Sequence, residues 1–272
     1  MWSARRLRVA LSTQQLVLVE HSRPWSRRPT AVQQLHYRSE GVAESAPWRP
    51  AVDALTRLLA QRQAQGAALH VVLCGRFARW QLLPWRAGLT RPQEWSAYAA
   101  VTFQETFGAV TREWQVQPSL QPPQHDVPAC AVDAGLLPAL RTACAEAGAT
   151  LATVAPYFSV AFDHWRSALE GRVVWFGVLE ADSLALGLLQ QEQWLGLRSQ
   201  RLDSDWRELL PGMMAQIGIQ AGLDEVETAA PRFYLTGAGE APAADPRHPF
   251  VWLQPRSQTQ FDGIGCRMAL GL

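Results

Sequence analysis

The sequence predicts an α/β protein of two related lobes, because each half of the chain opens with the same arrangement of strands. Residues 5–22 contain a predicted strand, a polar turn at residues 12–15 and a returning strand. Residues 172–191 repeat this plan around a turn at residues 180–183. Apolar or β-branched runs bounded by turn residues are typical of paired strands. Two similar hairpins in a chain of 272 residues indicate two lobes that face one another.

The composition indicates a folded protein without a strong charge-driven partner. Hydrophobic residues make up 48% of the chain and charged residues 18%, which is ordinary for a globular protein of one or two domains. A net charge of +1 argues against nucleic acid or an anionic membrane as the main partner. All 25 cationic residues are arginine. The chain therefore has no phosphate-loop lysine, no Schiff-base lysine and no lysine general base.

The cysteine pattern and the N-terminal segment indicate a protein of the cytosol. Cys74, Cys130, Cys144 and Cys266 form no CxxC pair and have no zinc-type spacing with histidine, so we expect free, mostly buried thiols in a reducing compartment. The first residues carry arginine but lack the apolar core of a signal peptide. No run approaches the roughly 18 apolar residues of a membrane helix.

The first hairpin is followed by the other elements of one lobe. Residues 30–38 predict a third strand, and residues 69–74 predict a short buried strand. Residues 48–64 between them predict a helix, because Val52, Leu55 and Leu58 lie at helical spacing and Gly66 is placed to end it.

Residues 76–117 predict a small inserted subdomain. Residues 77–83 read as a strand, and Thr90 with Gln93 fits a capping box that opens a helix. Aromatic residues then recur on one face of this helix, which Gly108 ends. Such a stripe is more commonly core than binding surface, and both interpretations remain open.

The rest of the chain predicts the end of the first lobe and the whole of the second. A proline-rich connector at residues 117–128 leads to strands at 129–132 and 150–154, and Asp133 is placed to cap the helix between them. After the second hairpin we expect a strand at 193–201, a helix at 206–221 that Pro211 kinks or delays, a strand at 232–236 and an exposed loop at 240–249.

With these elements the chain resembles the actin-like assembly proteins of bacterial type IV pili and type II secretion, the PilM and GspL group. The resemblance rests on residues 70–74, 82–85 and the helix that follows up to Gly108, and on residues 132–154, 232–239 and 268–272. It implies a duplicated actin-like, ribonuclease H-like fold with lobes at 1–156 and 157–272. The small α+β insert occupies about residues 76–117.

The resemblance also implies where a nucleotide would lie, and the sequence departs from the family pattern there. Working actin-like ATPases carry Asp-x-Gly in the first hairpin turn, to organise the metal ion and to let the backbone approach the phosphates. This chain has Ala10 and Ser12 at those positions. We therefore expect no cofactor, with ATP and Mg²⁺ as the alternative. The residues placed to contact a nucleotide are Ser12, Thr13, Glu180, Asp182, Gly237 and Gly239.

No other catalytic or metal site is expected. His125, Asp126 and Cys130 lie in or beside the proline-rich connector and lack an oxyanion-hole signature. The chain contains no GxSxG elbow, no phosphate-loop motif and no cluster of metal ligands. A sugar-kinase or acid-kinase relative would need a catalytic aspartate that the sequence does not place in the cleft.

Two functions remain. The first is a non-catalytic scaffold, peripheral at the cytoplasmic face of the inner membrane, that binds the cytoplasmic tail of a pilus or secretion protein between the first lobe and the insert. The second is an ATP-binding or slowly hydrolysing enzyme of the same fold. Arginine and aromatic side chains most often anchor protein contacts. The partner surface expected from the resemblance therefore comprises Arg76, Arg79, Trp80, Trp85, Trp95 and Tyr98.

Overall fold

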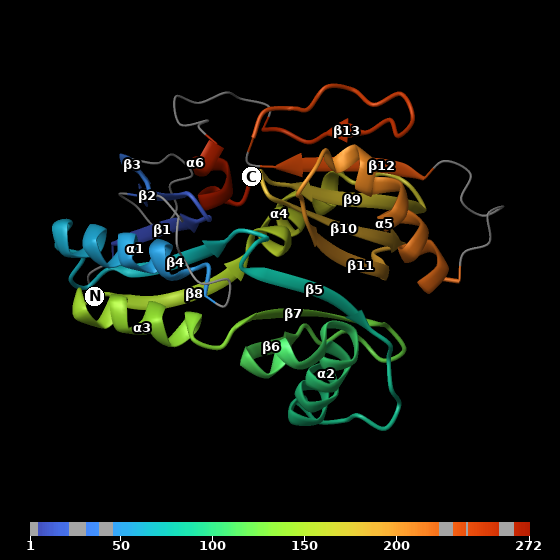
Figure 1. Ribbon diagram of the computed structural model, residues 1–272, viewed down its shortest axis with the longest axis horizontal. Helices are drawn as coiled ribbons and strands as arrows, with labels where there is room; N and C mark the ends of the chain where they lie inside the picture. The colour runs from blue at the N-terminus through green and yellow to red at the C-terminus, as the bar shows by residue number, and fades with distance from the viewer. Residues whose placement is uncertain (1–4, 22–30, 38–45, 223–230, 238, 256–263) are drawn as a thin grey trace.

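The computed structural model describes residues 5–21, 31–37, 46–222, 231–237, 239–255 and 264–272, and these residues contain two β-sheets (Figure 1). The sheet of the first lobe has the order β3-β2-β1-β4-β8. Its strands are β1 (Arg6–Leu11), β2 (Gln15–His21), β3 (Ala31–His36), β4 (Ala68–Leu73) and β8 (Thr150–Pro156).

The first predicted hairpin is confirmed. β1 and β2 pair antiparallel from Arg6 opposite His21 to Leu11 opposite Leu16, and β4 lies parallel to β1 on its other side. Residues 16–19 are all buried, which requires cover on both faces of the sheet. Helices α1 (Arg49–Gln61) and α3 (Leu136–Glu146) pack on each other, on β2 and on β8, whereas α6 (Ile264–Leu270) packs on β1 and β2.

The second lobe repeats the hairpin as predicted. β9 (Val173–Leu179) and β10 (Ser183–Gln190) pair antiparallel, and β11 (Gln193–Arg201) continues the meander. β12 (Arg232–Gly237) lies parallel to β9, and a short strand that the sequence did not predict, β13 (Val251–Trp252), pairs with β12. Helix α5 (Trp206–Gln220) packs on β10 and β11, and α4 (Tyr157–Trp165) lies at the junction of the lobes against β4, β8 and β9.

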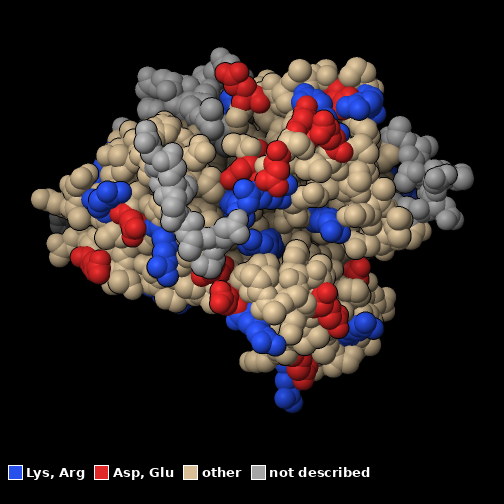
Figure 2. Space-filling view, in the orientation of Figure 1, with Lys and Arg blue, Asp and Glu red and all other residues tan. Residues whose placement is uncertain are grey.

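The insert is larger than the sequence indicated. It contains β5 (Ala78–Leu83), α2 (Pro92–Phe107), a 3₁₀ helix (Gly108–Glu113), β6 (Trp114–Pro118) and β7 (Val127–Asp133). β7 pairs antiparallel with both β5 and β6, so the insert extends to Asp133 instead of ending at Gln117. The proline-rich segment is only the loop that joins two strands of one sheet. Figure 2 shows a hollow where the insert meets the second lobe.

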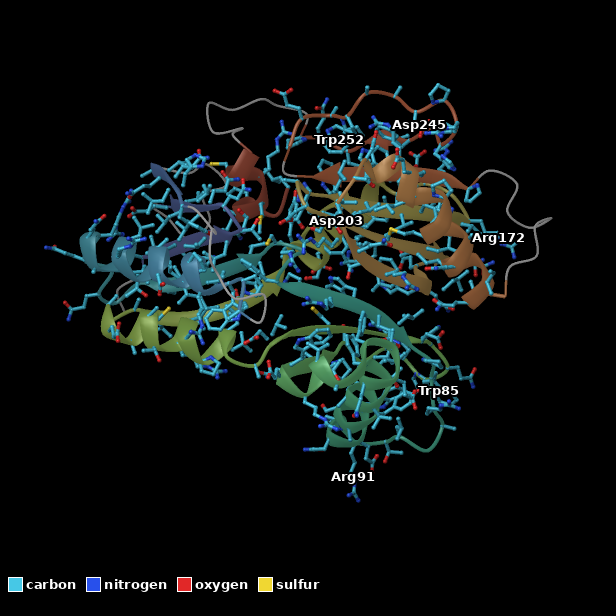
Figure 3. All side chains as sticks on the ribbon, viewed as in Figure 1. Trp85, Arg91, Arg172, Asp203, Asp245 and Trp252 are labelled. Carbon is cyan, nitrogen blue, oxygen red and sulfur yellow. The ribbon has the colours of Figure 1, made fainter. Side chains whose placement is uncertain are left out.

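Two helices begin one or two residues away from the positions that the sequence predicted. Helix α2 begins after Arg91, which lies at the far end of the insert (Figure 3), and Glu94 accepts hydrogen bonds from Thr90 N and Arg91 N at 2.9 Å each. Glu94, not Gln93, therefore closes the capping box, and the hydrogen bonds from these amides lower its pKa. Asp133 accepts from Gly135 N at 2.8 Å and closes a turn one step before α3 begins.

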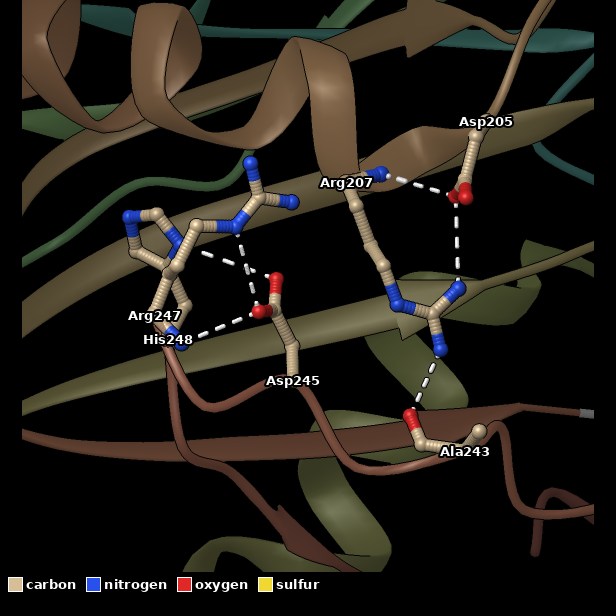
Figure 4. Close-up of polar contacts among 6 residues, drawn as sticks. All are labelled: Asp205, Arg207, Ala243, Asp245, Arg247 and His248. Carbon is tan, nitrogen blue, oxygen red and sulfur yellow. Dashed lines mark hydrogen bonds and ion pairs between the residues drawn. The ribbon is translucent and has the colours of Figure 1, made fainter.

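Pro211 does not delay α5. The helix begins at Trp206, where Asp205 Oδ1 accepts from Arg207 N at 3.1 Å (Figure 4). Arg207 also donates to Ala243 O at 2.6 Å and so ties the predicted loop at 240–249 to the start of α5. The loop is mostly exposed as expected, but Asp245 is buried and accepts from Arg247 N at 3.0 Å.

The C-terminal helix belongs to the first lobe in space, although the sequence placed it in the second. Arg8 Nη1 in β1 donates to Leu270 O at 3.1 Å, and the Tyr157 hydroxyl donates to Leu272 O. Val17 in β2 lies against Gly265, at which a methyl group would come within 1.9 Å of Val17 Cγ2. After the second lobe, the chain therefore crosses back to the first lobe, where residues 264–272 pack.

Candidate functional site

The turn of the first hairpin is held closed by its own groups and by the residue after β3. Ser12 N and Ser12 Oγ both donate to Gln15 O at 3.0 Å, and Gln15 N donates to Ser12 Oγ at 3.2 Å. The Tyr37 hydroxyl lies within hydrogen-bonding distance of Ser12 O, and Tyr37 N donates to Gln14 O at 2.9 Å. The Ser12 hydroxyl is therefore engaged inside the turn. It forms no hydrogen bond across the cleft among the described residues.

Ala10 is the penultimate residue of β1 and lies between Val17 of β2 and Val72 of β4. It is 3% exposed and belongs to the apolar core of the first lobe. The position at which the resemblance would place a metal-organising aspartate is thus an apolar core position in this chain.

The two hairpin turns contact each other directly across the cleft. Thr13 Oγ1 donates to Asp182 Oδ2 at 2.9 Å, and Gly75 N, just after β4, donates to Glu180 Oε1 at 2.7 Å. A methyl group at Gly75 would lie 2.6 Å from Ser183 Oγ, so the glycine is needed for this approach. The sequence analysis identified Thr13, Glu180 and Asp182 but missed Gly75, whose only signal is its place after a buried strand.

The carboxyl group of Glu180 is the most perturbed acid near the cleft. Burial raises its pKa to about 8, the Gly75 N–H acts in the opposite direction, and the neighbouring Asp182 carboxylate raises it further. With this pKa the Glu180 carboxyl group is mostly protonated and neutral at pH 7, so it can donate a hydrogen bond as well as accept one.

Gly237 ends β12 beside the second turn. It pairs with Leu179 of β9, and a methyl group there would lie 2.1 Å from Leu179 O and 3.2 Å from the Trp252 ring. Gly239 has open space around its Cα, and its carbonyl accepts from Arg267 Nη1 at 3.1 Å. The glycine of β12 thus permits close packing of strands and of Trp252.

The residues expected at the partner surface do not share one environment. Trp80 and Trp95 are 8% and 6% exposed and are core residues: Trp80 packs on Phe158 with ring centroids 5.4 Å apart, and Trp95 Nε1 donates to Leu89 O at 3.1 Å. The expectation of an accessible indole is wrong for Trp95, which lies between α2 and its sheet, whereas Trp80 also contributes to the lining of the cavity described below.

The other four residues of that set are partly exposed but divide between two places. Trp85 and Tyr98 lie on the insert, where Trp85 N donates to Asp126 Oδ1 at 2.9 Å. Arg76 and Arg79 instead line a cavity of about 710 Å³ between β5 and α2 of the insert and β11 and α5 of the second lobe. The predicted surface is therefore not continuous.

The second lobe contributes residues to this cavity that the sequence analysis missed. The lining side chains from that side include Arg198, Ser199, Gln200, Arg201, Gln216 and Gln220. No sequence signal could identify them, since they reach the insert through the pairing of β11 with β5, and these strands are more than 100 residues apart along the chain.

Among the described residues, no group of three or more His, Cys, Asp or Glu side chains is placed to hold a metal ion. No helix in the described part of the chain is both long enough and apolar enough to cross a membrane. Cys74, Cys144 and Cys266 are buried, and Cys130 is partly buried; burial raises the pKa of the Cys130 thiol to about 12.

The fold is similar to three solved structures over most of the chain. The cytoplasmic domain of EpsL, an inner-membrane component of the type II secretion system of Vibrio cholerae, matches 98% of this chain and 93% of its own with a TM-score of 0.60 and 12% identity. A Bacteroides thetaiotaomicron protein with an actin-like ATPase fold matches 87% of this chain and 82% of its own, with a TM-score of 0.59 and 11% identity.

The third similar structure is a PilM–PilN type IV pilus biogenesis complex, which matches 85% of this chain and 81% of its own, with a TM-score of 0.53 and 15% identity. No family model matches the sequence. No curated protein matches it either. The two paired hairpins, the sheet orders and these likenesses together define a two-lobe actin-like fold, of the kind seen in the EpsL and PilM structures.

Proposed function

We propose that this chain is a non-catalytic assembly protein of a type II secretion or type IV pilus complex. It would lie at the cytoplasmic face of the inner membrane and bind a cytoplasmic segment of a membrane protein. The likeness to the EpsL cytoplasmic domain over 98% of this chain and to the PilM–PilN complex over 85% supports this proposal. Because fold alone does not determine activity, the proposal depends on the site.

The observation that carries the non-catalytic part is the contact between the two hairpin turns. Phosphoryl transfer needs a positioned nucleotide and positive charge around its phosphates. Here the Thr13–Asp182 hydrogen bond joins the two turns that would face the phosphates, and the Gly75–Glu180 hydrogen bond ties the second turn to the segment after β4, so two acidic side chains occupy that place. No compensating lysine exists in the chain.

Calorimetry with ATP and Mg²⁺ tests this part. We expect no binding at nucleotide concentrations up to about 1 mM, the range in which enzymes commonly bind substrates. The matched variant is Glu180→Gln with Asp182→Asn, which removes both carboxylates at nearly constant volume. ATP binding by the unaltered protein, followed by steady release of phosphate, would instead establish the ATPase alternative.

Direct binding to membrane-protein tails tests the assembly part. Synthetic peptides are made from the cytoplasmic segments of the single-span membrane proteins encoded beside this chain. Their binding to the purified protein is measured by fluorescence anisotropy, with shuffled peptides as controls. Saturable binding of one tail, lost on shuffling, is the expected result, and the absence of binding by every tail contradicts the proposal.

A further inference from the structure

The cavity between the insert and the second lobe lies where two neighbouring strands of one sheet, β5 and β11, are only partly paired. β5 and β11 belong to the same eight-stranded sheet, but they share one ladder pair, Arg198 with Gln81. The Trp80 amide donates instead to a side chain, Ser199 Oγ, at 3.0 Å. Helices α2 and α5 contribute Thr102, Thr106, Gln216 and Gln220 to the cavity walls. The result is an elongated groove along the joint.

The groove carries excess positive charge. Four arginines line it, and Asp126 is the one acidic residue in its lining. Asp126 already accepts from Trp85 N, and Arg201 is paired with Asp203 at 2.9 Å. Arg76, Arg79 and Arg198 have no ion pair with any described residue. Figure 2 shows arginine surface gathered around this hollow in a protein whose net charge is only +1.

One of these arginines, Arg79, is held in place before any ligand arrives. The Arg79 guanidinium stacks on the Trp114 ring, 4.5 Å from its centroid. Burial, and next the nearby charge of Arg76, lower the pKa of Arg79, whereas the carboxylate of Asp133 raises it. An anion between Arg76 and Arg79 would offset the repulsion between these two cations. Ser183 also lines the groove, and its buried hydroxyl has no hydrogen-bond partner among the described residues.

We propose that this groove binds an acidic peptide segment, with carboxylates on Arg76, Arg79 and Arg198 and its backbone against the amide and hydroxyl groups of the walls. Arginine forks recognise carboxylates by paired hydrogen bonds, and clusters of arginine recognise acidic motifs. The inference deepens the proposed function, on which it rests, because it assigns the partner's tail to the side of the insert that faces the second lobe. A nucleotide fits less well, since Trp80, the one indole in the lining, is only 8% exposed and offers little surface on which a base could stack.

Fluorescence anisotropy with a labelled decamer containing four glutamates tests the inference, and the same decamer with glutamines is the control ligand. We expect saturable binding of the acidic peptide at about 50 mM salt, weaker binding at 150 mM, and none of the glutamine peptide. Arg76→Gln with Arg198→Gln should weaken binding at least tenfold. Arg172→Gln, an exposed arginine at the outer edge of the second lobe (Figure 3), should leave it unchanged.

A variant with one reversed charge, tested with an acidic and a basic peptide, separates loss of binding from loss of the fold. Arg198→Glu should abolish binding of the acidic peptide and gain binding of a lysine decamer, with an unchanged melting temperature. Equal weakening by Arg172→Gln, or tighter binding of inorganic triphosphate than of the peptide, overturns the inference. If the Arg76→Gln, Arg198→Gln variant still binds a natural tail, the inference about the groove is overturned, but the proposed assembly role stands. If no tail binds the unaltered protein, the assembly role itself is contradicted.

Discussion

Glu180 is the residue at which the structure couples protonation to stability. Its pKa is raised from 4.5 to about 8 by burial, with Asp182 adding to the effect. The folded state therefore binds this proton more tightly than the unfolded chain does. The corresponding part of the free energy of unfolding is fully present below about pH 4.5 and is lost as the pH rises through about 8.

Glu180→Gln should remove this pH dependence. The amide keeps an oxygen for the Gly75 N–H but cannot ionise, so we expect the variant to be more stable than the parent at pH 8.5, by on the order of 1–3 kcal/mol, and similar to it at pH 5. Urea unfolding at four pH values between 5 and 8.5 measures the effect. Glu105→Gln, on an exposed part of α2, is the control. Parallel pH profiles for all three proteins would contradict the assignment to Glu180.

The tryptophans of the insert should divide by burial. Trp95→Ala removes a 6%-exposed ring from between α2 and its sheet, so we expect a loss of about 3–5 kcal/mol in the free energy of unfolding. Trp85 is partly exposed, and its hydrogen bond to Asp126 uses the backbone, so Trp85→Ala should cost clearly less. Urea titrations of both variants provide the comparison, and similar losses would show that burial does not separate the two rings.

Among the secondary-structure elements, the positions of the strands were easier to predict than the strands with which they pair. The hairpins could be placed because apolar runs and turn residues are local signals. β7 was predicted as a strand yet assigned to the wrong sheet, because sheet membership depends on pairing with β5, 44 or more residues earlier along the chain. Helix starts shifted by a residue or two where an acidic side chain, Glu94 or Asp133, had a neighbouring amide to accept from.

Helix α6 provides a test of packing against propensity. Gly265→Ala should destabilise the protein by about 1–3 kcal/mol, because the new methyl group would lie 1.9 Å from Val17 Cγ2. Alanine is otherwise about 1 kcal/mol better than glycine inside a helix. Gly212→Ala in α5 is the matched control, because nothing lies within 4 Å of its added methyl group and stability should rise. Thermal melts measure both; a stabilising Gly265→Ala would show that α6 does not pack as described.

At the scale of the whole molecule, the contact between the turns should couple the lobes energetically. In a double-mutant cycle, Thr13→Val and Asp182→Asn should show an interaction of about 1–2 kcal/mol in the free energy of unfolding. Either substitution alone removes the hydrogen bond to the carboxylate, so the second substitution has no such bond left to remove. Thr106→Val with Asp182→Asn should be additive within about 0.5 kcal/mol. Additivity in the first cycle would mean that the turns do not touch in solution.

The sequence predicted only those residues of the candidate site that lie in a local pattern such as a turn. Ser12, Thr13, Glu180 and Asp182 were identified because each lies in a recognisable turn, and the structure brings the two turns together. The arginine groove was only half predicted. Arg76 and Arg79 lie just before and within β5, but Arg198 joins them through a single ladder pair, which no local pattern indicates.

The return of α6 to the first sheet makes the order of synthesis matter. Arg8 and the Leu270 carbonyl that it binds are 262 residues apart. At roughly 5–20 residues per second, translation takes about 10–50 s to span that interval. During this time β1 and β2 have left the ribosome, but the helix that covers Val17 does not yet exist. The sheet of the first lobe is thus completed only after the second lobe has been synthesised, and until then the face of β1 and β2 that α6 covers is open to chaperones and to neighbouring nascent chains.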